Sequence, residues 1–159
     1  MTEHSAIHDT FVIERTYPAS RSRVFAAFAS KEAKETWGDT GDIAGAEPPG
    51  GAEEFDFRVS GRERFGFAYQ GVSYAYDALY YDIVPDQRLV YSYEMYADGV
   101  RISISVATIE FGSAVDGTGT VLTWTEQGVY LDGFDGADAA RLREGGTSEM
   151  LDGLAKYLA

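Results

Sequence analysis

Alternating apolar and polar residues dominate the chain from Glu53 to Tyr130, and this pattern constrains the fold more than any other feature. Extended runs are predicted over residues 53–59, 73–84, 88–96, 101–111 and 120–130. Turn residues separate the later runs, at Pro85-Asp86, Asp98-Gly99 and Asp116–Gly119. Strands joined by short turns pair with their neighbours along the chain, so the pattern predicts an antiparallel sheet.

One further strand and two short helices are predicted before this region. Residues 11–17 alternate with Phe11, Ile13, Arg15 and Tyr17 on one face, which indicates a strand. Ser20 and Ser30 can each cap a following helical stretch, because a serine oxygen accepts a hydrogen bond from a free backbone N–H. Gly38 is expected to end the second helix.

The end of the chain, from about residue 136 to residue 158, is predicted to be a helix. Its apolar stripe has the i, i+1, i+4, i+8 spacing of one helix face and consists of Met150, Leu151, Leu154 and Leu158. Gly145-Gly146 lies inside this segment, and glycine costs about 1 kcal/mol relative to alanine in a helix. We therefore expect either a kink at this pair or a shorter helix that begins near Thr147.

These elements predict an α+β helix-grip fold, in which a curved antiparallel sheet wraps around a long C-terminal helix. The 159 residues suit one domain. We assign residues 1–8 to a flexible N-terminal tail and residues 9–159 to the domain. Residues 38–52 contain five glycines and the Pro48-Pro49 pair, and we expect this segment to be a mobile flap.

Composition excludes several classes of function. The chain has no cysteine, so thiol nucleophiles, thiolate zinc sites and iron–sulfur clusters are ruled out. Its net charge of −13 disfavours nucleic acid and anionic membranes as partners. The two histidines, His4 and His8, lie together near the N-terminus, which leaves no Ser-His-Asp arrangement and no His-carboxylate metal site. We expect a cytoplasmic monomer or homodimer without a metal or cofactor.

Arg15 is a candidate ligand-binding residue because the alternation puts it on the inner face of its strand. A buried guanidinium is costly unless it is paired. It would either bind a polar or anionic group of a ligand or form an internal ion pair, with Glu126 or Asp82 as the expected partner. Exposure of Arg15 at a twisted strand end is a further possibility.

Glu126 is the weak candidate for a catalytic residue. It follows Leu122 and Trp124 on one face of a predicted strand, whereas Gln127 is expected on the opposite face. A carboxyl group in an aromatic cavity has a raised pKa through desolvation and can act as a general acid or base. The structural alternatives are a partner for Arg15 or exposure to solvent.

Aromatic and apolar side chains are the expected wall of a cavity between sheet and helix. Tyrosines are concentrated between residues 69 and 96. Most of them are expected to be core, because aromatic residues suit strands and bury a large area. The predicted ligand-binding set, besides Arg15 and Glu126, is Tyr17, Trp37, Phe55, Phe57, Tyr80, Tyr91, Tyr93, Trp124, Met150 and Leu154.

The order of these elements and several local motifs resemble a known family. The motifs are residues 15–20, residues 23–28 with Trp37, residues 80–91, 101–111, 119–128 and 131–133, and residues 146–147 with 151–154. Together they look like the activator-of-Hsp90-ATPase-like branch of the START-related, Bet v 1-like (SRPBCC) superfamily, in a bacterial subgroup. The resemblance spans about residues 8–158.

This resemblance implies a helix-grip domain that binds a small, largely apolar molecule of unknown identity. Two alternatives stay open. One is a cyclase-, aromatase- or isomerase-like enzyme that uses Glu126 or Asp82 as the acid–base group and a tyrosine as the donor. The other is an Hsp90-associated interaction module, although the chain lacks the separate N-terminal domain of the eukaryotic activator.

Overall fold

The computed structural model describes residues 3–38 and 53–159, which form one sheet and three helices. The strands follow the order β1-β7-β6-β5-β4-β3-β2 in a seven-stranded sheet, and all paired neighbours are antiparallel. The elements are β1 (Ala6–Tyr17), α1 (Arg21–Ala29), α2 (Lys31–Trp37), β2 (Glu54–Phe55), β3 (Arg62–Tyr69), β4 (Val72–Val84), β5 (Arg88–Ala97), β6 (Val100–Ser113), β7 (Thr120–Leu131) and α3 (Ala139–Leu158).

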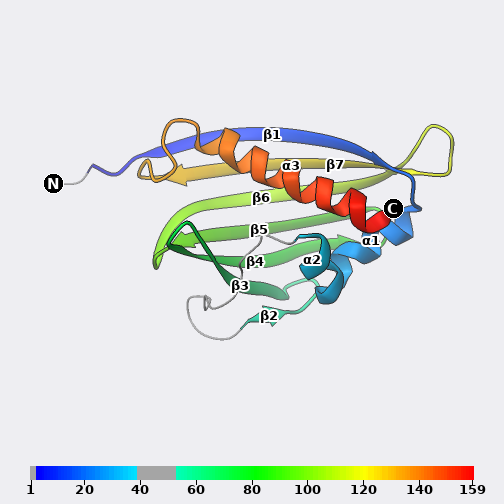
Figure 1. Cartoon of the computed structure of the whole chain (residues 1–159), viewed down its shortest axis with the longest axis horizontal. Helices are drawn as coiled ribbons and strands as arrows, with labels where there is room; N and C mark the ends of the chain where they lie inside the picture. Colours follow the sequence, from blue (N-terminus) through cyan, green and yellow to red (C-terminus); the bar gives the residue numbers. More distant parts are fainter. Residues whose placement is uncertain (1–2, 39–52) are drawn as a thin grey trace.

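The long helix α3 crosses one face of this sheet, which we call the inner face (Figure 1). It packs mainly against β1 at one edge and also contacts α2 and β7. The curved antiparallel sheet with a long C-terminal helix is the helix-grip α+β fold predicted from the sequence.

The predicted turns are present and have the expected backbone geometry. Asp98 and Gly99 have φ values of 47° and 81°, which suit the tight hairpin between β5 and β6. Asp86 also has a positive φ, of 63°, in the turn between β4 and β5. Short turns bring consecutive strands directly into register, and this explains the meander from β3 to β7.

The caps of the two short helices are also confirmed. The side-chain oxygen of Ser20 accepts a hydrogen bond from the backbone N–H of Arg23, and that of Ser30 accepts one from Ala33. Gly38 follows the last residue of α2, as predicted. The remainder of the expected flap, residues 39–52, lies outside the described residues.

Two strand boundaries differ from the sequence prediction. β1 begins at Ala6 rather than Phe11, so Ala6 to His8, assigned to the tail, pair with β7. The run predicted over residues 53–59 is a strand only at Glu54 and Phe55, because residues 58–60 turn and leave Val59 exposed.

The sequence pattern missed β3 altogether. Glu63 is a charged residue on the inner face between two arginines, so the aromatic alternation of β3 begins only at Phe65 and consists of Phe65, Phe67 and Tyr69.

α3 is one continuous helix from Ala139 to Leu158, and the predicted kink or late start at Gly145-Gly146 is wrong. Both sides of the glycine pair are attached to the sheet. Arg143 bonds to strand residues, and Thr147 and Leu151 are buried beyond the pair. These contacts outweigh the low helix propensity of glycine.

The core lies between the inner face of the sheet and the helices. Fully buried side chains come from every layer, namely Val24 of α1, Leu89, Ile109 and Leu122 of the sheet, and Leu151 and Leu154 of α3. Within the described residues, no helix is both long enough and apolar enough to cross a membrane.

We expect alanine at both Gly145 and Gly146 to stabilise the protein. A Cβ atom at either position would meet no heavy atom within 4 Å, so only the helix propensity changes. The gain should be about 1 kcal/mol per site, measured as the free energy of unfolding in urea. Gly153→Ala is the matched control, because its Cβ would collide with the carbonyl oxygen of Trp37. Loss of stability in the double variant would contradict this account of α3.

Candidate functional site

A buried carboxylate lies at the centre of the inner face. Glu126 of β7 is 0% exposed and shares its face with Leu122 and Trp124, as the alternation predicted. Its Oε2 atom accepts a hydrogen bond of 2.7 Å from the hydroxyl of Tyr93 on β5. Its Oε1 atom accepts one of 3.2 Å from the indole Nε1 of Trp124. Each carboxylate oxygen therefore has a buried donor, which is the condition for burying such a group.

Arg143 of α3 meets this carboxylate–tyrosine pair from the helix side. Its Nη1 donates to the Tyr93 hydroxyl at 3.0 Å, and its Nη2 donates to Ser103 Oγ at 2.8 Å. The guanidinium also lies over the rings of Tyr93 and Tyr130, 5.5 and 5.4 Å from their centroids. We call Tyr93, Ser103, Trp124, Glu126 and Arg143 the Glu126 cluster.

The electrostatics of the Glu126 cluster are set by burial. Desolvation raises the pKa of the Glu126 carboxyl above its ordinary value, while the hydroxyl of Tyr93, the charge of Arg143, the indole of Trp124 and the hydroxyl of Ser105 oppose the rise. Desolvation likewise raises the pKa of the Tyr93 hydroxyl, which is therefore a neutral donor at pH 7. A carboxyl with a raised pKa suits proton transfer. Here both oxygens are already held by buried donors, so the arrangement favours a fixed polar anchor over a free general base.

Small residues lie beside the Glu126 cluster on the inner face. Ser105 of β6 lies in register between Tyr93 and Gly128. A Cβ at Gly128 would come within 3.0 Å of Ser105 Oγ and 3.1 Å of the Tyr130 hydroxyl, so only glycine lets the Tyr130 side chain fold over the strand. Ser105 Oγ is buried and makes no hydrogen bond of good geometry with the described residues, but it lies close enough to Glu126 to help lower the pKa of that carboxyl. A hydroxyl held in this way can also bind water or a polar ligand atom.

A second buried carboxylate repeats the arrangement near the other edge of the sheet. Glu63 Oε2 of β3 accepts hydrogen bonds from the Tyr80 hydroxyl of β4 at 2.8 Å and from Lys34 Nζ of α2 at 2.6 Å. Lys34 also lies 5.9 Å above the ring of Phe55. We call Lys34, Glu63 and Tyr80 the Glu63 cluster. Each of the helices α2 and α3 is thus joined to the sheet by a cation that meets a tyrosine–glutamate pair.

Tyr91 of β5 lies between the two clusters. Its ring centroid is 5.7 Å from that of Tyr80 and 6.2 Å from that of Tyr93. It also meets Trp124 edge-on at 6.3 Å. The structure therefore brings together four residues of the predicted ligand-binding set in one aromatic wall, with a carboxylate at each end.

The wall continues onto β3 and β4 as four half-buried rings. Phe65 stacks on Tyr76 at 4.7 Å between centroids, and Phe67 stacks on Tyr74 at 5.2 Å. Tyr76 in turn stacks on Tyr93 at 5.0 Å, which connects these rings to the Glu126 cluster. We call Phe65, Phe67, Tyr74 and Tyr76 the β3–β4 aromatic cluster. The sequence analysis did not single out any of the four.

Arg15 forms its ion pair with α3 and not with Glu126 or Asp82. Its Nη2 lies 3.3 Å from Asp152 Oδ1 and donates to Ser148 Oγ at 2.6 Å. Asp82 is instead paired with Arg88 at 2.6 Å, away from the inner face. The expected partners were wrong because the distance from Arg15 to α3 depends on how the helix crosses β1, which strand alternation does not specify.

The remaining predicted residues are core or lie at its border. The Tyr17 hydroxyl donates to the Leu151 carbonyl at 2.9 Å, and burial raises its pKa to about 12. Trp37 Nε1 donates to the Ala27 carbonyl at 2.8 Å. Half-buried members of the set are Phe55, Phe57 and Met150, whereas Leu154 is fully buried. Their contact with a ligand stays a prediction.

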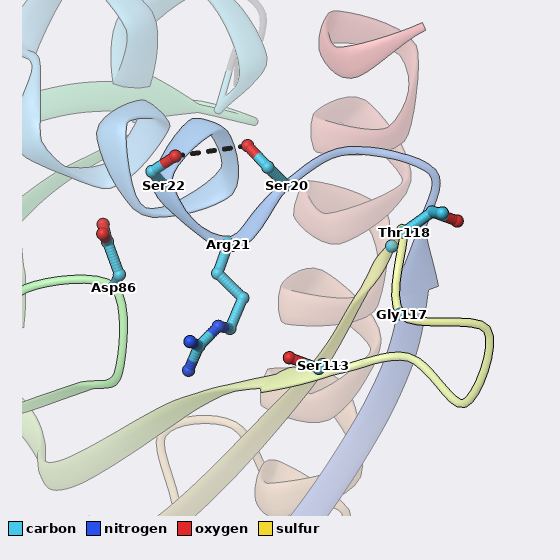
Figure 2. A pocket seen from close by; sticks show the side chains of 8 residues that line it. Ser20, Arg21, Ser22, Asp86, Ser113, Gly117 and Thr118 are labelled. Carbon is cyan, nitrogen blue, oxygen red and sulfur yellow. Dashed lines mark hydrogen bonds between the residues drawn. The ribbon is translucent and has the colours of Figure 1, made fainter.

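A surface pocket of about 330 Å³ lies elsewhere, where the start of α1 meets the β4–β5 turn and the β6–β7 loop (Figure 2). Ser20, Arg21, Ser22 and Asp86 line it with mostly polar atoms. Ser20 and Ser22 are hydrogen-bonded to each other at 3.2 Å, and Ser20 also caps α1. The pocket is open and polar, so it does not have the character of the apolar ligand site expected from the sequence.

Sequence reasoning missed Arg143, Glu63 and Lys34. The sequence pattern could have identified Arg143, because it lies four residues before Thr147 and eight before Leu151 on the inward stripe of α3. No sequence pattern could have identified Glu63 and Lys34, since their pairing depends on where α2 lies over β3. In the described ranges, no group of three His, Asp or Glu side chains is placed to hold a metal ion.

Comparison with known proteins identifies close relatives. The family model described as Activator of Hsp90 ATPase homolog 1-like protein matches residues 18–159. The Mll3558 protein of Rhizobium loti is 46% identical, with 97% of this chain and 99% of that chain covered and a TM-score of 0.81. An uncharacterised protein of Rhizobium leguminosarum is 42% identical, with 99% and 98% covered and a TM-score of 0.82.

A more distant structure, protein CV1439 of Chromobacterium violaceum, shares the fold alone. It is 23% identical, with 94% of this chain and 96% of that chain covered and a TM-score of 0.69. No curated protein matches the chain significantly.

We expect protein stability to depend on pH through Glu126. Because burial raises its pKa in the folded state, folding favours the protonated form. This contribution is complete below the unfolded pKa of about 4.3 and is lost as the pH rises through the folded value. Glu126→Gln cannot titrate. The unfolding free energy of the wild type minus that of the variant should therefore fall as the pH rises above about 4 in urea titrations. Glu110→Gln, on the exposed face, is the control, and a constant difference for Glu126→Gln would contradict the prediction.

Arg143→Met should destabilise the protein because it removes a half-buried cation from Glu126 and the attachment of α3 to the sheet. We expect a loss of about 1–3 kcal/mol in the free energy of unfolding. Arg101→Met is the matched control, since Arg101 also pairs with a glutamate and lies over a tyrosine ring but is exposed. Its loss should stay below about 1 kcal/mol. If the two variants lose the same free energy of unfolding, burial does not make the Arg143 contacts more stabilising than exposed ones.

Proposed function

Because the chain belongs to the Activator of Hsp90 ATPase homolog 1-like family, whose fold supports ligand binding in general, we propose that it binds a small, largely apolar molecule between the sheet and α3. The observation that carries this proposal is the Glu126 cluster set in an aromatic wall, next to the buried hydroxyl of Ser105. Apolar walls with a few fixed polar groups are typical of small-molecule sites.

The polar end of the ligand is assigned to Tyr93, Ser105 and Arg143 in this proposal. Arg15 was the cation expected from the sequence, but it is already engaged by Asp152 and Ser148. Arg143 lies beside Ser103 of β6 and is half-buried, so in this proposal its guanidinium is the cation that meets the polar end of the ligand. The apolar body of the ligand would then lie against Tyr91 and Trp124, both of which the sequence predicted.

Binding, rather than catalysis, fits the way Glu126 is held. A general base must reach the proton that it removes. Both oxygens of Glu126 instead accept hydrogen bonds from other side chains of the protein, and the residue is fully buried. Its role in the proposal is to orient Tyr93 and to balance the charge of Arg143.

Native mass spectrometry of the freshly purified full chain, followed by thermal shift with 1-decanol, decanoic acid and 2-naphthol, tests the proposal. A probe at 100 times its dissociation constant adds about 2.7 kcal/mol of stability. In a domain of this size, that raises Tm by roughly 5–10 °C. We expect at least one probe to do so, and Tyr93→Phe to weaken its binding.

Tyr96→Phe provides the matched control, because its hydroxyl contacts Glu94 and Arg101 rather than the Glu126 cluster. It should leave the shift unchanged. A mass spectrum that contains only the ligand-free protein, together with no change in Tm for any of the three probes, would contradict ligand binding at this site.

A further inference from the structure

β1 forms one edge of the sheet, and its outer side has no strand partner among the described residues. The strand has 12 residues, pairs with β7 without a register shift, and contains neither proline nor lysine. In Figure 1, none of the described elements lies beyond β1 along most of its length. Protein sheets usually protect such an edge with prolines, lysines, bulges or very short strands. The opposite edge strand, β2, is of the protected kind, since it has 2 residues.

The even-numbered residues of β1 direct their backbone N–H and C=O groups toward this open edge. Ser5 donates its N–H to the side chain of Asp132, which follows β7, and its carbonyl accepts from the Asp132 N–H. Because backbone groups alternate between the two sides of a strand, odd-numbered residues face β7. The Thr10 N–H is accordingly held by the carboxylate of the residue before it, Asp9, at 2.8 Å. All the edge-facing residues are exposed, namely Ala6, His8, Thr10, Val12, Glu14 and Thr16.

An added strand would give each of these backbone groups a partner. The same strand from a second copy can pair with β1 in the antiparallel direction about a two-fold axis, which closes the assembly at two chains. In such a pair, side chains on the same face of the sheet lie opposite each other. The position of the axis therefore decides which charges meet.

An axis at Val12 matches the charges of β1. Asp9 then lies opposite Arg15 of the second copy, and the symmetry repeats this contact. No like charges are opposite each other in this register. With the axis at Phe11 or Ile13, the residue opposite Asp9 is uncharged.

The two charged residues can make this contact. Asp9 is exposed and has no ion pair in the described part of the chain. The side chain of Arg15 is 31% exposed and uses Nη2 for its contacts with Ser148 and Asp152. Its Nε makes no hydrogen bond with the described residues. Val12 is 60% exposed and would be covered by Val12 of the second copy.

We propose that the β1 edge binds a second copy of this chain, through antiparallel pairing of the two β1 strands about a two-fold axis at Val12. The two sheets then form one continuous sheet with both α3 helices on the same face. This inference goes beyond the proposed function and does not depend on it.

Two properties set the expected strength of this dimer. The net charge of −13 opposes the approach of two copies, but at an ionic strength of about 0.15 M charges more than about 8 Å apart are largely screened. A single pair of strands is a small interface. We therefore expect a dimer that dissociates on dilution.

Sedimentation equilibrium and amide hydrogen exchange of the full chain, each over a range of protein concentrations, test the interface. We expect a monomer–dimer equilibrium with a Kd below about 1 mM. At high concentration, the amides of Thr10, Val12 and Glu14 should exchange at least about tenfold more slowly than at low concentration. The amides of Phe11 and Ile13 should change little, because they are already bonded to β7.

Substitutions at the axis test the register. Val12→Lys and Val12→Glu each put like charges opposite each other and should raise the Kd at least about tenfold. An equal mixture of the two variants should restore the dimer, because opposite charges then meet at the axis. Asp9→Lys should also raise the Kd, since it puts a cation opposite Arg15. Val100→Lys is the matched control, because Val100 is 63% exposed but lies on β6.

Three results would overturn the inference. The first is a chain that stays monomeric at about 1 mM. The second is a dimer in which the exchange of Thr10, Val12 and Glu14 does not depend on concentration, which would place the interface elsewhere. The third is tighter association of Val12→Lys, which would show that net charge rather than strand pairing controls contact between copies. None of these results affects ligand binding, which the probe titrations decide separately.

Discussion

Burial of Glu126 is the constraint on which the rest of the structure depends. A carboxylate removed from water needs donors on both oxygens and a compensating charge, or it destabilises the fold. Tyr93 and Trp124 supply the donors from β5 and β7, and Arg143 supplies the charge from α3. These partners come from distant parts of the chain. The contacts of one carboxyl group therefore connect β5, β7 and α3 at one place in the fold.

The Glu63 cluster has the same arrangement of a glutamate, a tyrosine and a helix cation near the other edge of the sheet. Lys34 and Arg143 each reach from a helix to a tyrosine–glutamate pair, so α2 and α3 are attached to the sheet at two separated points. The inner face between these points carries Tyr91 and the stacked rings near it. A helix that is held at polar points need not bury the whole sheet face with its own side chains, and the proposed ligand would bind against the part that α3 does not cover.

Strand alternation was sufficient to predict much of the fold and several of the strand residues of the candidate site, but not its helix residues. It placed Glu126, Trp124, Tyr91 and Tyr93 on one face because a strand's side chains alternate strictly with sequence position. It could not give the partners of Arg15, which depend on the path of α3. It also failed at Glu63, because a charged residue that points inward is indistinguishable from surface in a single strand. The kink predicted in α3 failed for the related reason that tertiary contacts outweigh the local cost of two glycines.

Ser103 and Ser105 add to this centre polar groups that stability alone does not require. Alanine in both positions would fit the same space and remove the need for hydrogen-bond partners. Ser103 has a structural role, since it accepts a hydrogen bond from Arg143, whereas Ser105 makes no bond of good geometry among the described residues and has only a weak interaction with Glu126. Together with a carboxyl whose burial raises its pKa, this is a local departure from the most stable arrangement. Departures of this kind are expected where a protein holds polar groups ready for another molecule.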